Sequence, residues 1–146
     1  MSCTFEKLSV KDGKLVKKWL ACKDVNRWFS IDNWNRFYRW VSRSPNHFLY
    51  AAKIGGRMLG MVELGFEGEK AHFALIIDPA EHNKGYGKQV LRHFLANAAA
   101  MTNDNAKVIV AGIEEGNHGS IRCFEACGFR QNGSDESGIP RYEYRL

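Results

Sequence analysis

The amino-acid sequence predicts an α+β fold in which helices flank a mixed and mostly antiparallel sheet. Two kinds of periodicity predict this fold. Between residues 47 and 77, short runs rich in β-branched and aromatic residues are separated by turn residues, as in an antiparallel meander. From residue 85 onwards, stretches with apolar residues at helical spacing alternate with further strand-like runs.

The N-terminal third is expected to hold one short strand followed by helices. Residues 4–8 are typical of a strand, and the apolar positions within residues 14–22 predict a helix. A turn or second short helix begins at Val25. Asp32 is expected to cap a helix over residues 33–42, because its side chain can accept a hydrogen bond from the first helical turn.

The rest of the chain is expected to supply most of the sheet. Strands 47–54 and 57–66 are joined by a Gly55-Gly56 hairpin turn, and a third strand ends at Ile77. Beyond it, the expected helices cover residues 85–101 and 117–127, and the expected strands cover residues 107–113, 129–132 and 140–145.

Composition indicates a single domain over residues 1–146. The sequence is 45% hydrophobic and 25% charged, which is ordinary for a globular protein. No apolar run approaches the roughly 20 residues of a membrane span, and the N-terminus lacks the layout of a signal peptide. A cytoplasmic protein without a membrane partner is expected.

The net charge of +5 is unevenly placed. Residues 1–53 hold 11 Lys and Arg against 4 Asp and Glu, a net charge of +7, and the remainder carries −2. A basic region containing tryptophans could bind nucleic acid. The basic residues form no run, however, so a solvated surface is favoured and no nucleic-acid partner is predicted.

Four cysteines, at positions 3, 22, 123 and 127, are expected to be reduced thiols. Cys123 and Cys127 are four residues apart on one predicted helix, which could be half of a metal site. No partner pair has convincing metal-ligand spacing, so core packing is favoured and no metal is predicted.

The most informative stretch is residues 78–88, where an apolar strand stops at Pro79 and a glycine-bearing loop opens a helix. Backbone N–H groups and the positive end of the helix dipole converge at such a helix start and can hold an anion. Gly85 and Gly87 leave room for phosphate oxygens, and Lys84 and Lys88 add positive charge. The stretch therefore predicts a pyrophosphate site and a nucleotide-containing cofactor.

Spacing excludes two common nucleotide motifs. The P-loop requires Ser or Thr after its lysine, but Gln89 follows Lys88. The dinucleotide fingerprint requires a third glycine, and Val90 stands at that position.

A second pattern lies downstream at residues 117–129, a short helix that places Ile121, Phe124 and Cys127 on one face and ends at Gly128. The two stretches together resemble the GNAT superfamily of N-acetyltransferases. Residues 82–87 are similar to its loop Gln/Arg-x-x-Gly-x-Gly/Ala, with His82 at the first position. Residues 117–129 are similar to Asn-x-x-Ala/Ser-x-x-x-Tyr-x-x-x-Gly-Phe, with Phe124 at the tyrosine position. The resemblance covers residues 47–133 well and the first 46 loosely.

The resemblance implies the GNAT fold and direct transfer of an acetyl group from acetyl-CoA to a primary amine, with the acceptor unidentified. It also implies the residues that bind the co-substrate, which are Leu75, Ile76, Ile77, Asn83, Lys84, Gly85, Tyr86, Gly87, Lys88, Asn117 and Phe124.

Glu63 and His72 are the candidate catalytic residues. Glu63 is a carboxylate among apolar residues and could serve as the base, although it could equally lie on an exposed strand face. Strand alternation is expected to point Ala71, rather than His72, towards the catalytic face. Because Phe124 has no proton to give the leaving thiolate, a non-catalytic acyl-CoA-binding module is the alternative function.

The acceptor side is expected in the aromatic N-terminal region, with Trp28 and Trp34 lining its pocket. Parts of the sequence resemble the aminoglycoside 6′-N-acetyltransferase-like branch, and the motifs are also similar to the ribosomal-protein-acetyltransferase-like branch. The +7 charge argues against polycationic acceptors. A small-molecule amine or a peptide N-terminus, bearing a carboxylate or aromatic group, is predicted, and the protein is expected to be a monomer or homodimer.

Overall fold

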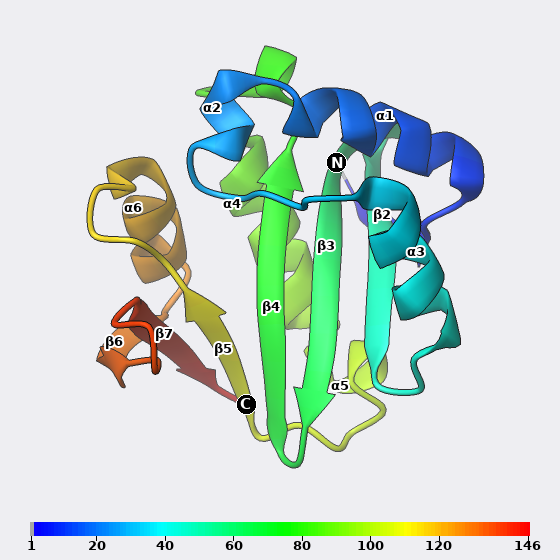
Figure 1. The fold of residues 1–146 in the computed structure, drawn as a ribbon. Helices are drawn as coiled ribbons and strands as arrows, with labels where there is room; N and C mark the ends of the chain where they lie inside the picture. Colours follow the sequence, from blue (N-terminus) through cyan, green and yellow to red (C-terminus); the bar gives the residue numbers. More distant parts are fainter. Residues whose placement is uncertain (1) are drawn as a thin grey trace.

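A computed structural model describes residues 2–146, which form a seven-stranded sheet in the order β1-β2-β3-β4-β5-β7-β6 (Figure 1). Only the β4–β5 pair is parallel among the strand pairs of the described residues, and this confirms the predicted α+β class with a mixed, mostly antiparallel sheet. The strands are β1 (Cys3–Lys7), β2 (His47–Ile54), β3 (Arg57–Glu67), β4 (Lys70–Ile77), β5 (Val108–Gly112), β6 (Arg130–Ser134) and β7 (Pro140–Arg145).

Helices cover both faces of this sheet (Figure 1). The helices are α1 (Val10–Leu20), α2 (Lys23–Asn26), α3 (Trp34–Arg43), α4 (Tyr86–Ala96), α5 (Ala98–Met101) and α6 (His118–Ala126), with a 3-10 turn η1 (Pro79–Glu81). In residues 2–146, no helix combines the length and the apolar character that a bilayer crossing requires.

Two apolar clusters, one on each face, hold the layers together. The larger cluster packs α4 and α6 against one face and centres on side chains such as Phe73, Phe94 and Phe129. The smaller packs α1, α2 and α3 against the other face, here called the front face, through residues such as Trp19 and Met61. Because side chains alternate along a strand, the central strands β2, β3 and β4 contribute to both clusters.

Several helix boundaries differ from those predicted. The first helix begins at Val10, four residues early, because Ser9 caps it by accepting a hydrogen bond from Asp12 N at 3.0 Å. Asn33, not Asp32, caps α3, with its Oδ1 accepting from Arg36 N at 2.9 Å. The side chains that cap a helix are polar, so the apolar pattern that located these helices could not find their first residues.

The long helix predicted over residues 85–101 is divided at Asn97 into α4 and α5. The Asn97 side chain donates a hydrogen bond to the His93 carbonyl at 2.8 Å and so competes with continued helical bonding.

The parallel pair β4–β5 is short. Its register covers only Lys70–His72 against Val108–Val110, and β4 then continues to Ile77 without β5 beside it. The two strands diverge in this region, while β3 pairs with β4 along its other edge as far as Ile77. The C-terminal half of β4 therefore has one edge without a strand partner, and the cleft described next lies there.

Candidate active site

A cleft of about 650 Å³ opens beside the free edge of β4, bounded by the loop into α4, the start of α6 and the α2 region. Ten of the eleven residues predicted to bind the co-substrate line it: Leu75, Ile76, Ile77, Asn83, Gly85, Tyr86, Gly87, Lys88, Asn117 and Phe124. Lys84 does not line it. The structure thus brings together two motifs that are about 30 residues apart in the sequence.

The start of α4 presents backbone N–H groups to this cleft. Gly85 is the N-cap residue, and it adopts a left-handed conformation at φ 82° that residues with a Cβ rarely adopt. A glycine has no side chain to cap the helix, so the first-turn amides stay available to an anion. A Cβ at Gly87 would have Cys123 Sγ 3.7 Å and Ile77 Cγ1 3.8 Å away. Position 87 therefore has space for one carbon and little more.

Residues 75–77, at the free edge of β4, line the same cleft. His82 Nε2 donates a hydrogen bond to the Ile77 carbonyl at 2.9 Å, so His82 fastens the loop to the end of the strand. This is a structural use for the residue that departs from the Gln/Arg of the motif.

Glu81 lies at the mouth of the cleft between two cations. Its carboxylate accepts hydrogen bonds from Lys84 Nζ at 3.0 Å and from Arg57 at 2.9 Å. These two bonds hold the pKa of the Glu81 carboxyl below its usual value. Lys84 is therefore tied to Glu81, which explains why it does not line the cleft.

The opposite wall is the start of α6. Asn117 lines the cleft and also caps its own helix, with Oδ1 accepting from Ser120 N at 3.4 Å. Phe124 reaches the cleft while packing edge-on against Phe129 at 5.0 Å between ring centroids. Burial raises the pKa of the neighbouring Cys123 thiol to about 11, so this sulfur is protonated at neutral pH.

Glu63 lies on the front face, where its side chain is partly buried and contacts a histidine. Its side chain is 19% exposed, and its Oε2 lies 2.6 Å from Nε2 of His47, which is 20% exposed. The carboxylate forms part of a hollow of about 540 Å³ whose walls come from residues 29–33 and α3. We call this the aromatic hollow, and it is lined by Phe29, Ser30, Ile31, Asp32, Asn33, Arg36, Phe37, Trp40 and Glu63.

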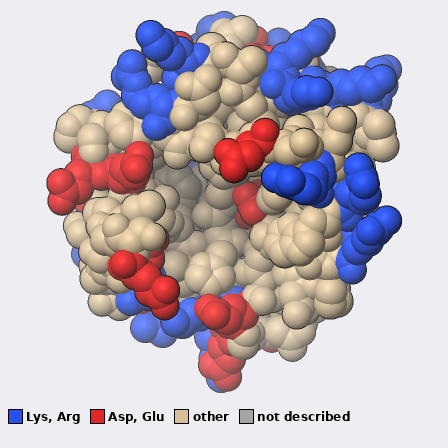
Figure 2. Space-filling model, in the orientation of Figure 1, with Lys and Arg blue, Asp and Glu red and all other residues tan. Residues whose placement is uncertain are grey.

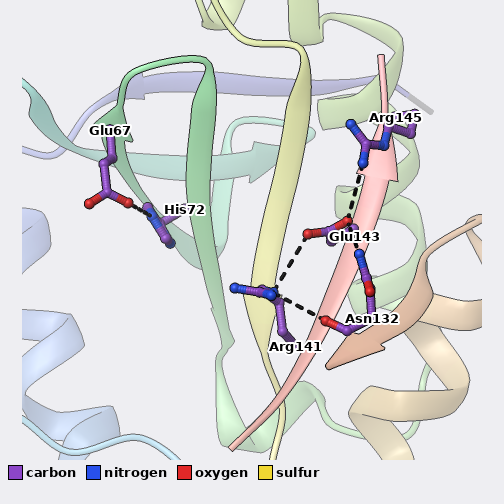
Figure 3. A network of polar contacts seen from close by, with 6 residues as sticks. All are labelled: Glu67, His72, Asn132, Arg141, Glu143 and Arg145. Atoms are coloured by element: carbon purple, nitrogen blue, oxygen red, sulfur yellow. Dashed lines mark hydrogen bonds and ion pairs between the residues drawn. The ribbon is translucent and has the colours of Figure 1, made fainter. Parts of the chain in front are cut away.

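His72 lies on the same face as Glu63, and Ala71, which was expected to point to the catalytic face, lies on the opposite one. Glu63 pairs with Ala74 across β3 and β4, so residues 72, 74 and 76 face the front, and Ala71 is buried in the cluster beneath α4. His72 is 51% exposed and bonds Glu67 at 3.1 Å (Figure 3).

Beside His72, the front face of β7 carries a separate polar network (Figure 3). Glu143 contacts Arg141 at 3.6 Å and Arg145 at 3.7 Å, and it accepts a hydrogen bond from Asn132 at 2.9 Å. These charges are paired with one another.

The two tryptophans predicted to line the acceptor pocket lie in different places. Trp28 lines the cleft, and its ring covers Gly116, where a Cβ would come within 3.1 Å of it. Trp34 is 8% exposed and packs between α1 and α3, with its ring over Gly13 and beside Tyr38. The structure does not place Trp34 at the cleft or in the aromatic hollow.

Much of the basic charge of the N-terminal third lies outside both cavities, although Arg36 lines the aromatic hollow. A third hollow, on the outer side of α1 and α3, is lined by Lys14, Lys17, Arg39 and Arg43 among others. Figure 2 shows basic side chains at the upper and right margins of the front face and acidic side chains around its central hollow. The +7 charge of residues 1–53 is therefore spread largely over surfaces outside the two cavities.

A sheet whose strands diverge beside an uncapped helix start is typical of one class of proteins. Comparison with known sequences identifies that class. The chain belongs to the acetyltransferase (GNAT) family, whose model matches residues 14–129, and it is an N-acetyltransferase of that family. The family resemblance of the two motifs is thereby confirmed. A curated relative, the uncharacterized N-acetyltransferase YfmK of Bacillus subtilis (strain 168), is 29% identical over 141 residues, or 92% of this chain and 91% of YfmK.

Solved structures share the fold over nearly the whole chain. Spermidine N-acetyltransferase from Vibrio cholerae, in complex with CoA and spermine, superposes with a TM-score of 0.81 at 16% identity, covering 99% of this chain and 95% of that one. Aminoglycoside acetyltransferase AAC(6′)-Ib, in complex with ribostamycin and CoA, gives 0.83 at 15% identity, covering 99% and 94%. At these identities the likeness confirms the GNAT fold.

Proposed function

We propose that this chain transfers an acetyl group from acetyl-CoA directly to a primary amine. The observation that supports this best is the cleft itself, where the free edge of β4, the uncapped start of α4 and the start of α6 converge. The acceptor is a small-molecule amine or a peptide N-terminus, and the cytoplasmic location and the monomeric or dimeric state remain predictions.

The residues of the cleft fit a CoA molecule in two respects. The amides of residues 85–88 and the Lys88 ammonium suit a pyrophosphate, because a helix start without a side-chain cap attracts anions. The free backbone edge at residues 75–77 suits the amide-bearing arm, since unpaired strand groups hydrogen-bond an extended chain. Bound acetyl-CoA supplies a thioester-linked acetyl group.

Side chains of this protein must then remove a proton from the acceptor amine. An amine attacks only when it is neutral, so a base must take one proton from its ammonium form. Glu63 is the proposed base, because its half-buried carboxylate lies beside the strand that borders the cleft. His72 is the second candidate, more exposed and bonded to Glu67.

During transfer, the amine nitrogen forms a bond to the acetyl carbon and loses its second proton to solvent, while the carbon–sulfur bond breaks and its electron pair leaves on sulfur. A backbone N–H of residues 75–77 would stabilise negative charge on the acetyl oxygen. Phe124 cannot protonate the sulfur, so the sulfur either takes a proton from solvent or leaves as a thiolate.

Two measurements test this proposal. Calorimetry should show CoA binding, and mass spectrometry should detect an acetylated product from a panel of amino acid derivatives, peptides, polyamines, arylalkylamines and aminoglycosides. CoA binding without any acetylated amine would support the alternative, a non-catalytic acyl-CoA-binding module. Absence of CoA binding to the folded protein would reject both.

A further inference from the structure

We propose that the acceptor binds in the aromatic hollow, with its amine on the carboxylate of Glu63 and an aromatic body between the surrounding rings, and that His47 is the positioning residue for that carboxylate. This inference rests on the proposed acetyl transfer and names its acceptor class, a primary amine carried on a flat apolar body.

The aromatic hollow and the cofactor cleft are neighbours. Phe29 contributes to the walls of both cavities. Glu63 is paired with Ala74, the residue immediately before the part of β4 that lines the cleft. Directly paired residues on antiparallel strands are about 5 Å apart. The backbone of Glu63 is therefore one residue along the sheet from the segment of β4 that lines the cleft.

The Glu63 carboxylate is held in a fixed orientation by a fixed imidazole. The His47 ring lies 4.9 Å from the Trp40 ring and 6.2 Å from Phe37, centroid to centroid. On another side it covers Gly65, where a Cβ would come within 3.2 Å of Nδ1. Two aromatic rings, a glycine and the 2.6 Å contact to Glu63 thus determine where Nε2 points.

This arrangement leaves one carboxylate oxygen for a ligand. Nε2–H of His47 donates to Oε2, and Oε1 has no hydrogen-bond partner among residues 2–146 and is not sealed from solvent. An ammonium group can therefore donate to Oε1. When it transfers its proton, the N–H bond breaks, an O–H bond forms on Oε1, and the nitrogen keeps the electron pair needed for attack.

The walls of the hollow favour an aromatic body over a second cation. Phe29, Ile31, Phe37 and Trp40 supply apolar surface, and Trp40 leaves 54% of its area exposed. Asp32, Arg36 and Glu63 are the charged residues of the hollow, which gives it one net negative charge. One carboxylate suits one ammonium, and stacked rings bury a flat apolar group well.

Acceptor binding is tested first by calorimetry on the CoA-loaded protein, with 2-phenylethylamine, n-butylamine and spermidine as ligands. Phenylethylamine should bind at least about fivefold more tightly than either of the others. Trp40→Ala should remove that preference and raise the KM for phenylethylamine, and kcat is also expected to fall because the Trp40 ring packs against His47. Arg43→Ala, on the same helix but outside the hollow, is the matched control. Equal affinities for the three amines, or an unchanged preference in Trp40→Ala, would overturn the proposal.

The positioning role is tested at His47. His47→Ala should lower kcat at least about tenfold with intact CoA affinity, and His47→Gln should restore most of it, because the glutamine amide can donate to Oε2. His93→Ala, at a histidine bonded to its own helix, is the control. Equal kcat values for His47→Ala and His47→Gln would overturn the positioning role. Failure of these tests with acetylation of other amines intact would leave the proposed function standing.

Discussion

Lys84 Nζ lies 3.0 Å from Oε2 of Glu81, three residues earlier, so the lysine nearest the glycine loop is already held by a carboxylate. Arg57 bonds the other oxygen of Glu81 at 2.9 Å. The pair explains why a cation expected to contact phosphate lies outside the cleft. It also connects β3, η1 and the loop, which positions the start of α4.

Because Glu81 has a lowered pKa in the folded protein, its contribution to stability depends on pH. A group whose pKa is lower in the folded state stabilises the fold fully at pH values above its unfolded-state pKa, which is about 4.3 for glutamate. This contribution to stability is lost as the pH falls through the folded-state pKa. Glu81→Gln should therefore lower the urea midpoint at pH 7 and match the wild type in stronger acid. Parallel midpoint curves at all pH values would contradict the linkage.

A valine at position 87 should weaken CoA binding. The structure leaves room for a Cβ there, but Cys123 and Ile77 already lie at contact distance, so two further methyl groups must extend into the cleft. We expect Gly87→Val to reduce CoA affinity at least about tenfold, or about 1.4 kcal/mol, in calorimetry. Gly112→Val, in β5 and outside the cleft lining, is the control for folding. Wild-type affinity in folded Gly87→Val would argue against the assigned phosphate site.

Cys123 should be dispensable for turnover. Its thiol lines the cleft, but burial raises its pKa to about 11, so little thiolate is present at neutral pH to accept an acetyl group. Cys123→Ala is expected to keep kcat within about threefold of wild type, as is the control Cys127→Ala. Alkylation of Cys123, followed by peptide mass spectrometry, should accelerate as the pH rises towards 11. A trapped acetyl-Cys123 would refute direct transfer.

The cofactor cleft was predictable because its motifs are local. A glycine at a left-handed N-cap, such as Gly85, is required by backbone geometry that neighbouring residues alone establish. Asn117, whose side chain caps the start of α6, is likewise placed by residues next to it in the sequence. Asn83 lies in the short loop between η1 and α4, and its place follows from the same local pattern. The family resemblance that these local motifs carry named eleven residues before the fold was known, and ten of them line the cleft.

The His47–Glu63 pair could not be predicted in this way, because a single bulge creates it. A regular two-residue hairpin at Gly55-Gly56 would place Glu63 opposite Phe48, whose side chain packs on the α4 side of the sheet. The structure shifts the register between Ala52 and Lys53, so Leu49 lies opposite Glu63, and Glu63 turns to the face that holds His47. A one-residue shift exchanges the two faces of a strand.

Trp34 illustrates a second reason why the sequence alone could not predict the site. Aromatic residues at helical spacing within residues 34–40 predicted an aromatic surface, and composition does not say which rings enter the core. The structure buries Trp34 over Gly13 and leaves Trp40 exposed in the hollow. Packing between α1 and α3 determines which of the two rings is buried, and this packing joins residues about 20 positions apart in the sequence.

The last prediction concerns Phe124, which stands where the family motif has tyrosine. Its ring packs against Phe73 and Phe129, and the residue also lines the cleft, so we expect a hydroxyl added at its tip to reach the cleft. Phe124→Tyr should maintain or raise kcat once an acceptor is known, because a phenol can give the leaving sulfur a proton, and CoA affinity should not change. Steady-state kinetics with a thermal melt checks this. Phe124→Leu is the matched variant that keeps an apolar side chain without adding a donor. A loss of more than about tenfold in kcat for Phe124→Tyr, with an unchanged melting temperature, would mean that Phe124 contacts the acceptor or shapes the cleft and that its lack of a proton is irrelevant.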